Sequence, residues 1–124
     1  MAFAKELVAT GLHTSTASAI GGSLATGITA KASGTQADGT QLAAAVNVIA
    51  TCATGGDSAL LPKGVQAGDE VWVRNNGAAS ANVYPQVGGA INGGSANAAL
   101  AVANGKTAIF KAVSNLDWVA VITA

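Results

Sequence analysis

The stretch GDEVWVRNNGAASANVYP, residues 68–85, decides how the second half of this chain is interpreted. Apolar and polar residues alternate along EVWVRN and again along ANVYP, and this two-residue period predicts strands that are buried on one face. Val71 and Val73 share one side of the first strand, and Trp72 lies on the other side. The stretch contains no catalytic group, so we expect it to build a surface for assembly.

Similar short alternating runs follow one another through the rest of the chain. They are AVNVIATCA (45–53), NAALAVA (97–103), KTAIFKAVS (106–114) and DWVAVIT (117–123). Asn76-Gly77 predicts a hairpin-type turn, because both residues tolerate a positive φ, and Pro85 predicts a strand end or an edge. Strands spaced about 8–12 residues apart and separated by such turns predict an all-β fold, a small antiparallel β-sandwich or barrel.

The charge balance excludes several classes of partner. Six Lys and Arg balance six Asp and Glu among the 124 residues, and only 10% of the residues are charged. About 25% is usual in a soluble domain. Without a basic patch, no nucleic-acid binding is expected. No continuous apolar stretch approaches the roughly 18 residues that span a bilayer, so no membrane association is expected either.

The first residues and the single cysteine bear on where the protein is made. The first residues, MAFAKELVATGLHTS, lack the basic start and apolar run of a signal peptide, so none is expected. The single cysteine, Cys52, excludes an internal disulfide and fits synthesis in the cytoplasm.

The apolar fraction of 50% predicts a thin core, because alanine is its largest component and only 4% of the residues are aromatic. Alanine buries little area, at about 25 cal/mol per Å² of apolar surface removed from water. A monomer with so thin a core and so few charges would be marginally stable and poorly soluble. Burial of one subunit against another would remedy both faults, so the composition favours an oligomer or an assembly component.

Residues 1–40 differ in kind from residues 41–124. They are rich in Ala, Gly, Ser and Thr and show no sustained apolar period, which is also typical of a disordered tail. We interpret them as an extended N-terminal arm that a neighbouring subunit or partner orders, and residues 41–124 as the β body. The predicted contact residues are the isolated large apolar side chains Leu7, Leu12, Ile20, Leu24 and Ile28.

Residues that could carry chemistry are few, and we expect the chain not to be an enzyme. Ser58 lies in a Gly-Asp-Ser-Ala-Leu stretch that resembles a hydrolase signature, but the one histidine, His13, lies far upstream in the arm. The glycines of residues 88–94 lack the following helix and Lys-Ser/Thr that a phosphate loop needs. One His and one Cys cannot build a zinc site. We therefore expect no cofactor, no metal and no small-molecule substrate.

The aromatic residues have two interpretations. Trp72, Phe110 and Trp118 are predicted to serve core or intersubunit packing, since the sequence has few other large groups. Alternatively, Trp72 or Tyr84 could form a stacking platform for a sugar, which would make the chain a receptor- or glycan-binding module.

The order of several short motifs resembles small virion proteins of tailed bacteriophages, of the capsid decoration, cement or head-fibre type. An Asn-Val-Ile strand leads to Leu-Pro, and GDEVWVRNNG, NVYP, ING, GKTAIF and a terminal DWVA follow in that order. The resemblance covers roughly residues 40–124, and TGITAKASGTQADGTQLAAAVNVI is similar to the segment that leads into that body.

This resemblance implies a non-enzymatic protein on the capsid surface of a virion, assembled in the host cytoplasm. Such decoration proteins are commonly homotrimers that bind the major capsid protein and stabilise contacts between capsomers, with an arm reaching adjacent capsomers. The alternative that remains open is a receptor- or glycan-binding module of a phage fibre or tail component.

Overall fold

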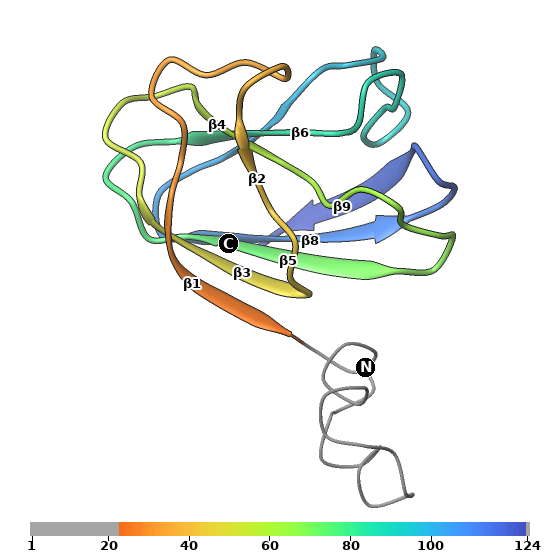
Figure 1. Ribbon diagram of the computed structural model, residues 1–124, viewed down its shortest axis with the longest axis horizontal. Coiled ribbons are helices and arrows are strands. Elements are labelled where there is room, and N and C mark those ends of the chain that lie inside the picture. Colours follow the sequence, from red (N-terminus) through yellow and green to blue (C-terminus); the bar gives the residue numbers. More distant parts are fainter. Residues whose placement is uncertain (1–22, 124) are drawn as a thin grey trace, which may run out of the picture.

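The computed structural model describes residues 23–123, in which all of the regular structure is β-strand (Figure 1). The strands are β1 (Leu24–Thr29), β2 (Thr40–Gln41), β3 (Val46–Thr51), β4 (Asp57–Leu60), β5 (Glu70–Asn75), β6 (Ala81–Tyr84), β7 (Leu100–Val102), β8 (Lys106–Ala112) and β9 (Trp118–Ile122). They form a five-stranded sheet in the order β1-β3-β5-β8-β9 and a four-stranded sheet in the order β2-β4-β6-β7.

The first six strands alternate between the two sheets. As a result, β1, β3 and β5 pair in parallel in one sheet, and β2, β4 and β6 pair in parallel in the other. Only the last strands pair antiparallel, with β7 beside β6, β8 beside β5 and β9 beside β8. The chain therefore crosses back and forth between the two sheets through β6, and its last three strands then add to the sheets in antiparallel pairing.

The strand content confirms the all-β prediction, and the pairing of the strands corrects its details. The expected antiparallel pairing is wrong for the first six strands, and the two mixed sheets do not close into a barrel. The reason lies in the connections: each of the first five crosses to the opposite sheet, so the next strand in the same sheet runs in the same direction. Asn76-Gly77 is such a crossing from β5 to β6 and not the predicted hairpin.

The expected boundary between arm and body at residue 40 also needs correction. Residues 24–29 form β1, which pairs with β3 of the same chain, and β2 begins at Thr40. Ile28 packs against the core of its own chain. These residues are thus ordered by their own chain, and only residues 1–22 of the predicted arm lie outside the described residues.

The inner faces of both sheets share one core. Val73 of β5 and Phe110 of β8 come from the five-stranded sheet, and Ala59 of β4 and Val83 of β6 come from the four-stranded one, all fully buried. Trp118, at the start of β9, packs edge-to-face on Phe110 with ring centroids 6.2 Å apart and an interplanar angle of 86°. The two largest fully buried side chains thus lie on β8 and β9.

The free edge of β9 is closed by Asn92. Its side chain accepts a hydrogen bond from the Ala120 amide at 2.8 Å and donates one to the Ala120 carbonyl at 3.2 Å. Its backbone amide donates to the carbonyl of Trp118 at 2.8 Å. Because an uncharged edge strand is a template for further strands, this amide protects the edge from pairing with another chain.

Replacing Asn92 with Gly should open this edge while keeping the positive φ of 56° that the backbone adopts there. We expect a loss of about 1–2 kcal/mol in the free energy of unfolding, because two hydrogen bonds disappear. Amide hydrogen exchange at Ala120 should accelerate, whereas exchange at buried β5 amides should change only as much as global stability does. An unchanged Ala120 exchange rate would contradict the edge-closing role.

Candidate association surface

Each strand of the five-stranded sheet places at least one large apolar side chain on the outer face. Leu24 is the Cα partner of Val46, Val46 of Trp72, Trp72 of Ile109, and Ile109 of Val121. Residues in register across a sheet point to the same face, so these five side chains form a line across it, here called the apolar row. With strands about 4.8 Å apart, the row is about 19 Å long.

The alternation of each strand turns the row away from the core. In β5, Val71 and Val73 are buried, and Trp72 between them is half-buried. The two ends of the row are the most open, with Leu24 65% and Val121 64% exposed. The middle members are half-buried. A line of large apolar side chains in this position is typical of a surface that another molecule covers.

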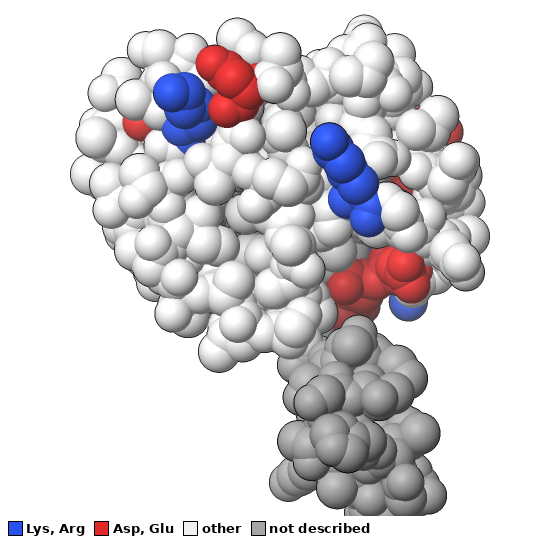
Figure 2. Space-filling model, viewed as in Figure 1, with Lys and Arg blue, Asp and Glu red and all other residues white. Residues whose placement is uncertain are grey.

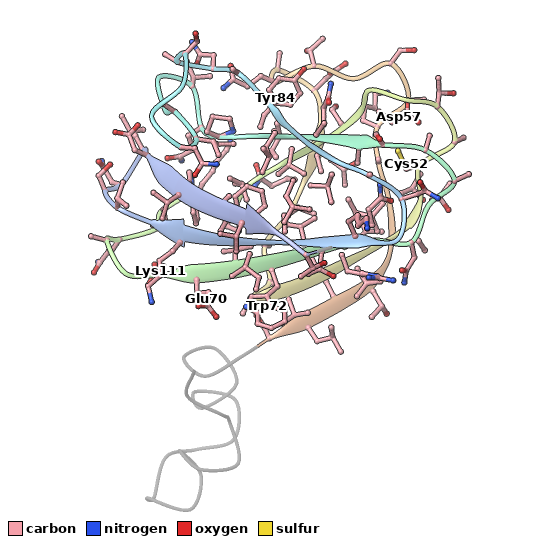
Figure 3. The ribbon with its side chains drawn as sticks, turned by 180° about the vertical axis from the view of Figure 1, so that it is seen from behind. Cys52, Asp57, Glu70, Trp72, Tyr84 and Lys111 are labelled. Atoms are coloured by element: carbon pink, nitrogen blue, oxygen red, sulfur yellow. The ribbon has the colours of Figure 1, made fainter. Side chains whose placement is uncertain are left out.

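Polar groups flank the middle of the row. Glu70 and Lys111 are Cα partners on neighbouring strands, and the indole Nε1 of Trp72 donates a hydrogen bond to Glu70 Oε2 at 2.8 Å. On the other flank, Arg74 Nε donates to Asn76 Oδ1 at 2.7 Å. Glu70, Trp72 and Lys111 point to the same side of the sheet, away from the other sheet (Figure 3). An apolar centre with a polar rim is the usual anatomy of a protein interface.

Charge is sparse on the rest of the visible surface. Figure 2 shows a few small groups of basic and acidic side chains on a face that is otherwise uncharged. A surface with so few charges exerts only weak long-range electrostatic attraction on a partner. Contacts made with it therefore depend mainly on apolar burial and shape.

The predicted contact and packing residues fall in different places. Leu24 begins the apolar row and Ile28 packs on the core, whereas Leu7, Leu12 and Ile20 lie outside the described residues. Phe110 and Trp118 are buried at 0% and 1% exposure. Trp72 is the central member of the row.

Sequence reasoning missed Val46, Ile109 and Val121 as surface residues. Strict alternation counted back from the buried Cys52 predicts that Val46 and Val48 point inward, but Asn47 and Ile49 occupy the inner face of β3. The buried Asn47 amide donates to the carbonyls of Ala44 at 2.8 Å and Trp72 at 3.2 Å. The signal in the sequence was the asparagine between two valines. A buried asparagine whose amide bridges backbone groups can take the inner face of a strand and turn the neighbouring valines outward.

The groups that could carry chemistry lie in the interior or outside the described residues. Ser58 is fully buried and its hydroxyl donates to the Thr35 carbonyl at 3.4 Å. Burial, and then the negative charge of Asp57, raise the pKa of the Cys52 thiol, which disfavours the reactive thiolate. His13 lies outside the described residues.

Asp57 fastens two loops to the start of β4. Its carboxylate accepts hydrogen bonds from the backbone amides of Ser33 and Thr54, each at 3.2 Å. Within residues 23–123, no group of three or more His, Cys, Asp or Glu side chains is placed to hold a metal ion. In the same range, no helix has the length and apolarity needed to cross a membrane.

An open depression of about 430 Å³ lies beside the four-stranded sheet. Gln36 and Gln41 line it, but the Nε2 of Gln36 donates to the Pro85 carbonyl at 2.9 Å and that of Gln41 to the Leu61 carbonyl at 3.0 Å. Tyr84 does not line the depression, and it lies on the opposite side of the molecule from Trp72 (Figure 3). The two aromatic residues considered for sugar stacking therefore do not form one platform.

No protein-family model, curated protein or solved structure matches this chain.

Proposed function

We propose that this chain is a non-enzymatic virion structural protein, a decoration protein that binds the outer shell of a tailed bacteriophage and stabilises contacts between capsomers. The observation that carries the proposal is the apolar row on the outer face of the five-stranded sheet. The resemblance of the motif order to phage decoration proteins supplies the identity of the partner, the major capsid protein.

The energetics favour a multivalent attachment. A fully buried Val, Leu or Ile side chain contributes about 1.5–3 kcal/mol, and three members of the row are already half-buried in the single chain. Association itself costs about 4–15 kcal/mol in lost freedom. One row alone therefore gives weak attachment, whereas a homotrimer with three rows gains affinity because each bound subunit holds the others near the shell.

The mechanical role follows from this multivalency. Packed DNA pushes the shell outward, so contacts between capsomers near symmetry axes are under tension. A decoration trimer that binds several capsomers must be released from each before they separate. Because the contacts are largely apolar, attachment should depend little on salt.

Charges placed at the exposed ends of the row test the proposal. The variant Leu24→Asp/Val121→Asp should lose more than ~10-fold in affinity for virus particles that lack the protein, because two desolvated contacts become charged. Both side chains are over 60% exposed in the single chain, so folding should be unaffected. Co-sedimentation with the particles measures binding.

The control is Val87→Asp, since this valine is 76% exposed and lies in the loop after β6, away from the row. It should bind like the unaltered protein. Equal binding by all three proteins would contradict the row as the shell contact. A protein that binds a glycan array through Trp72, and not the particles, would support the receptor-binding alternative.

A further inference from the structure

We propose that Asn92 is a site of spontaneous covalent modification, at which the folded protein converts this asparagine to aspartate or isoaspartate and thereby loosens the edge of β9. The backbone nitrogen of Gly93 loses its proton to solvent and attacks Cγ of Asn92. A succinimide ring closes, and Nδ2 leaves as ammonia. Water then opens the ring at either carbonyl. The reaction needs only water and takes place in the isolated chain, so it stands or falls independently of the shell-binding function.

The sequence contains three Asn-Gly pairs, Asn76-Gly77, Asn92-Gly93 and Asn104-Gly105. Glycine after asparagine favours ring closure, because it has no side chain to obstruct the attacking nitrogen and its backbone turns freely. All three asparagines are exposed, so exposure does not distinguish them. The glycine amides do distinguish them, since a nitrogen whose N–H is held in a hydrogen bond is neither free to turn nor ready to lose its proton.

The attacking nitrogens beside Asn76 and Asn104 are both held by Asn75. The Gly77 amide donates to Oδ1 of Asn75 at 2.9 Å, and the Gly105 amide donates to the carbonyl of Asn75 at 2.7 Å. Asn75 is fully buried and joins the two sheets. Either nitrogen is therefore released only when the interior of the protein opens.

The Gly93 amide is not held in this way. Asn92 and Gly93 form the centre of a tight turn, with φ values of 56° and 68°, which the Gly94 amide closes by donating to the Ile91 carbonyl at 3.1 Å. Gly93 is exposed, and its own amide donates no hydrogen bond to any residue from 23 to 123. Of the three pairs, this one has the free nucleophile.

The side chain of Asn92 controls when the reaction can occur. Its carboxamide makes two hydrogen bonds to Ala120, at 2.8 and 3.2 Å, and while both are made Cγ cannot turn toward the Gly93 nitrogen. Both bonds are exposed, and exposed bonds at the edge of a sheet open locally while the core stays folded. Each opening of the β9 edge therefore allows ring closure, and hydrolysis makes the change irreversible.

Both products close the edge less well than asparagine does. Aspartate at this position still accepts from the Ala120 amide, but it has no donor for the Ala120 carbonyl and places a negative charge beside that oxygen. Isoaspartate also adds a methylene to the main chain directly after Ile91, which is buried and bridges to Trp118. An edge strand with unpaired backbone groups is a template for pairing with another chain.

Peptide mapping by mass spectrometry tests the site. The full-length protein is incubated in mildly alkaline buffer, digested at intervals, and the aspartate and isoaspartate peptides are separated by chromatography. In the folded protein we expect Asn92 to react more than ~10-fold faster than Asn76 or Asn104, because local opening is enough to release it. The same protein unfolded in urea is the reference, in which all three pairs should react at similar rates.

Variants separate the site from its consequence. Asn92→Gly should remove the main product, whereas Asn104→Gly should leave it unchanged. Asn92→Asp carries one of the two products from the start, and its Ala120 amide should exchange hydrogen faster than in the unaltered protein. Similar rates for the three pairs in the folded protein, or no reaction at Asn92 while the unfolded reference reacts, would overturn the proposed site. Unchanged Ala120 exchange in Asn92→Asp would overturn the loosening of β9.

Discussion

Replacing Trp118 with Ala is expected to lower the free energy of unfolding by about 3–5 kcal/mol. Trp118 is 1% exposed and packs edge-to-face on Phe110. The composition contains few large groups, so no neighbour can expand to fill the space that the indole leaves. Removing it creates a cavity where the two sheets meet the last strand.

The backbone hydrogen bonds of Trp118 remain in the alanine variant, so the expected loss reports on the side chain. Its amide donates to the Ala90 carbonyl at 2.9 Å and its carbonyl accepts from the Asn92 amide, so this residue joins β9 to the loop that closes its edge. Denaturant titration followed by circular dichroism measures the loss. Trp118→Phe, which keeps an aromatic ring against Phe110, should lose clearly less. A loss under about 1 kcal/mol for Trp118→Ala would place this side chain outside the core.

Replacing Asn75 with Ala is expected to cost about 3–5 kcal/mol, although it removes little apolar surface. The side chain is fully buried. Its Nδ2 donates to the carbonyls of Ala79 and Val102, each at 2.8 Å, and its Oδ1 accepts from the Gly77 amide at 2.9 Å. The change leaves the Val102 carbonyl and the Gly77 amide buried without this partner, and the part-buried Ala79 carbonyl also loses it. Each buried unsatisfied group costs about 1–3 kcal/mol.

The neighbouring Asn76 is the matched control for Asn75. It is exposed and its side chain accepts only from Arg74 Nε among the described residues, so Asn76→Ala should cost less than about 1 kcal/mol. Asn75→Asp keeps the acceptor for Gly77 but removes both donors, and it should be nearly as unstable as Asn75→Ala. Equal stability of the Asn75 and Asn76 variants would show that this amide does not hold the two sheets together.

The sequence pattern was sufficient to predict most strands of the body. The alternation in EVWVRN, KTAIFKAVS and DWVAVIT coincides with β5, β8 and β9. The pattern could not reveal the parallel winding, because Asn76-Gly77 has the composition of a hairpin turn. Gly77 is required there for a different reason: a Cβ at this position would lie 2.6 Å from the Cβ of Cys52. A close approach between distant segments has no local signature in the sequence.

β1 and the apolar row were hidden for related reasons. LATGIT contains Gly27, which adopts a φ of 67° and interrupts the alternation within β1, so the strand resembled the low-complexity segment before it. The row requires the register of five strands, most of which are separated by strands of the other sheet along the chain. Trp72 was singled out as an aromatic residue, but its partners across the sheet follow only from the pairing.

The proposed function is tested most directly by a cryo-electron microscopy map of tailed-phage particles to which this protein has been added. We predict density for the two-sheet body on the outside of the shell, at positions between capsomers, with Leu24, Trp72 and Val121 turned toward the major capsid protein. A body found on a tail fibre, or one that presents the five-stranded face to solvent while bound through another surface, would contradict the shell-binding role of the row.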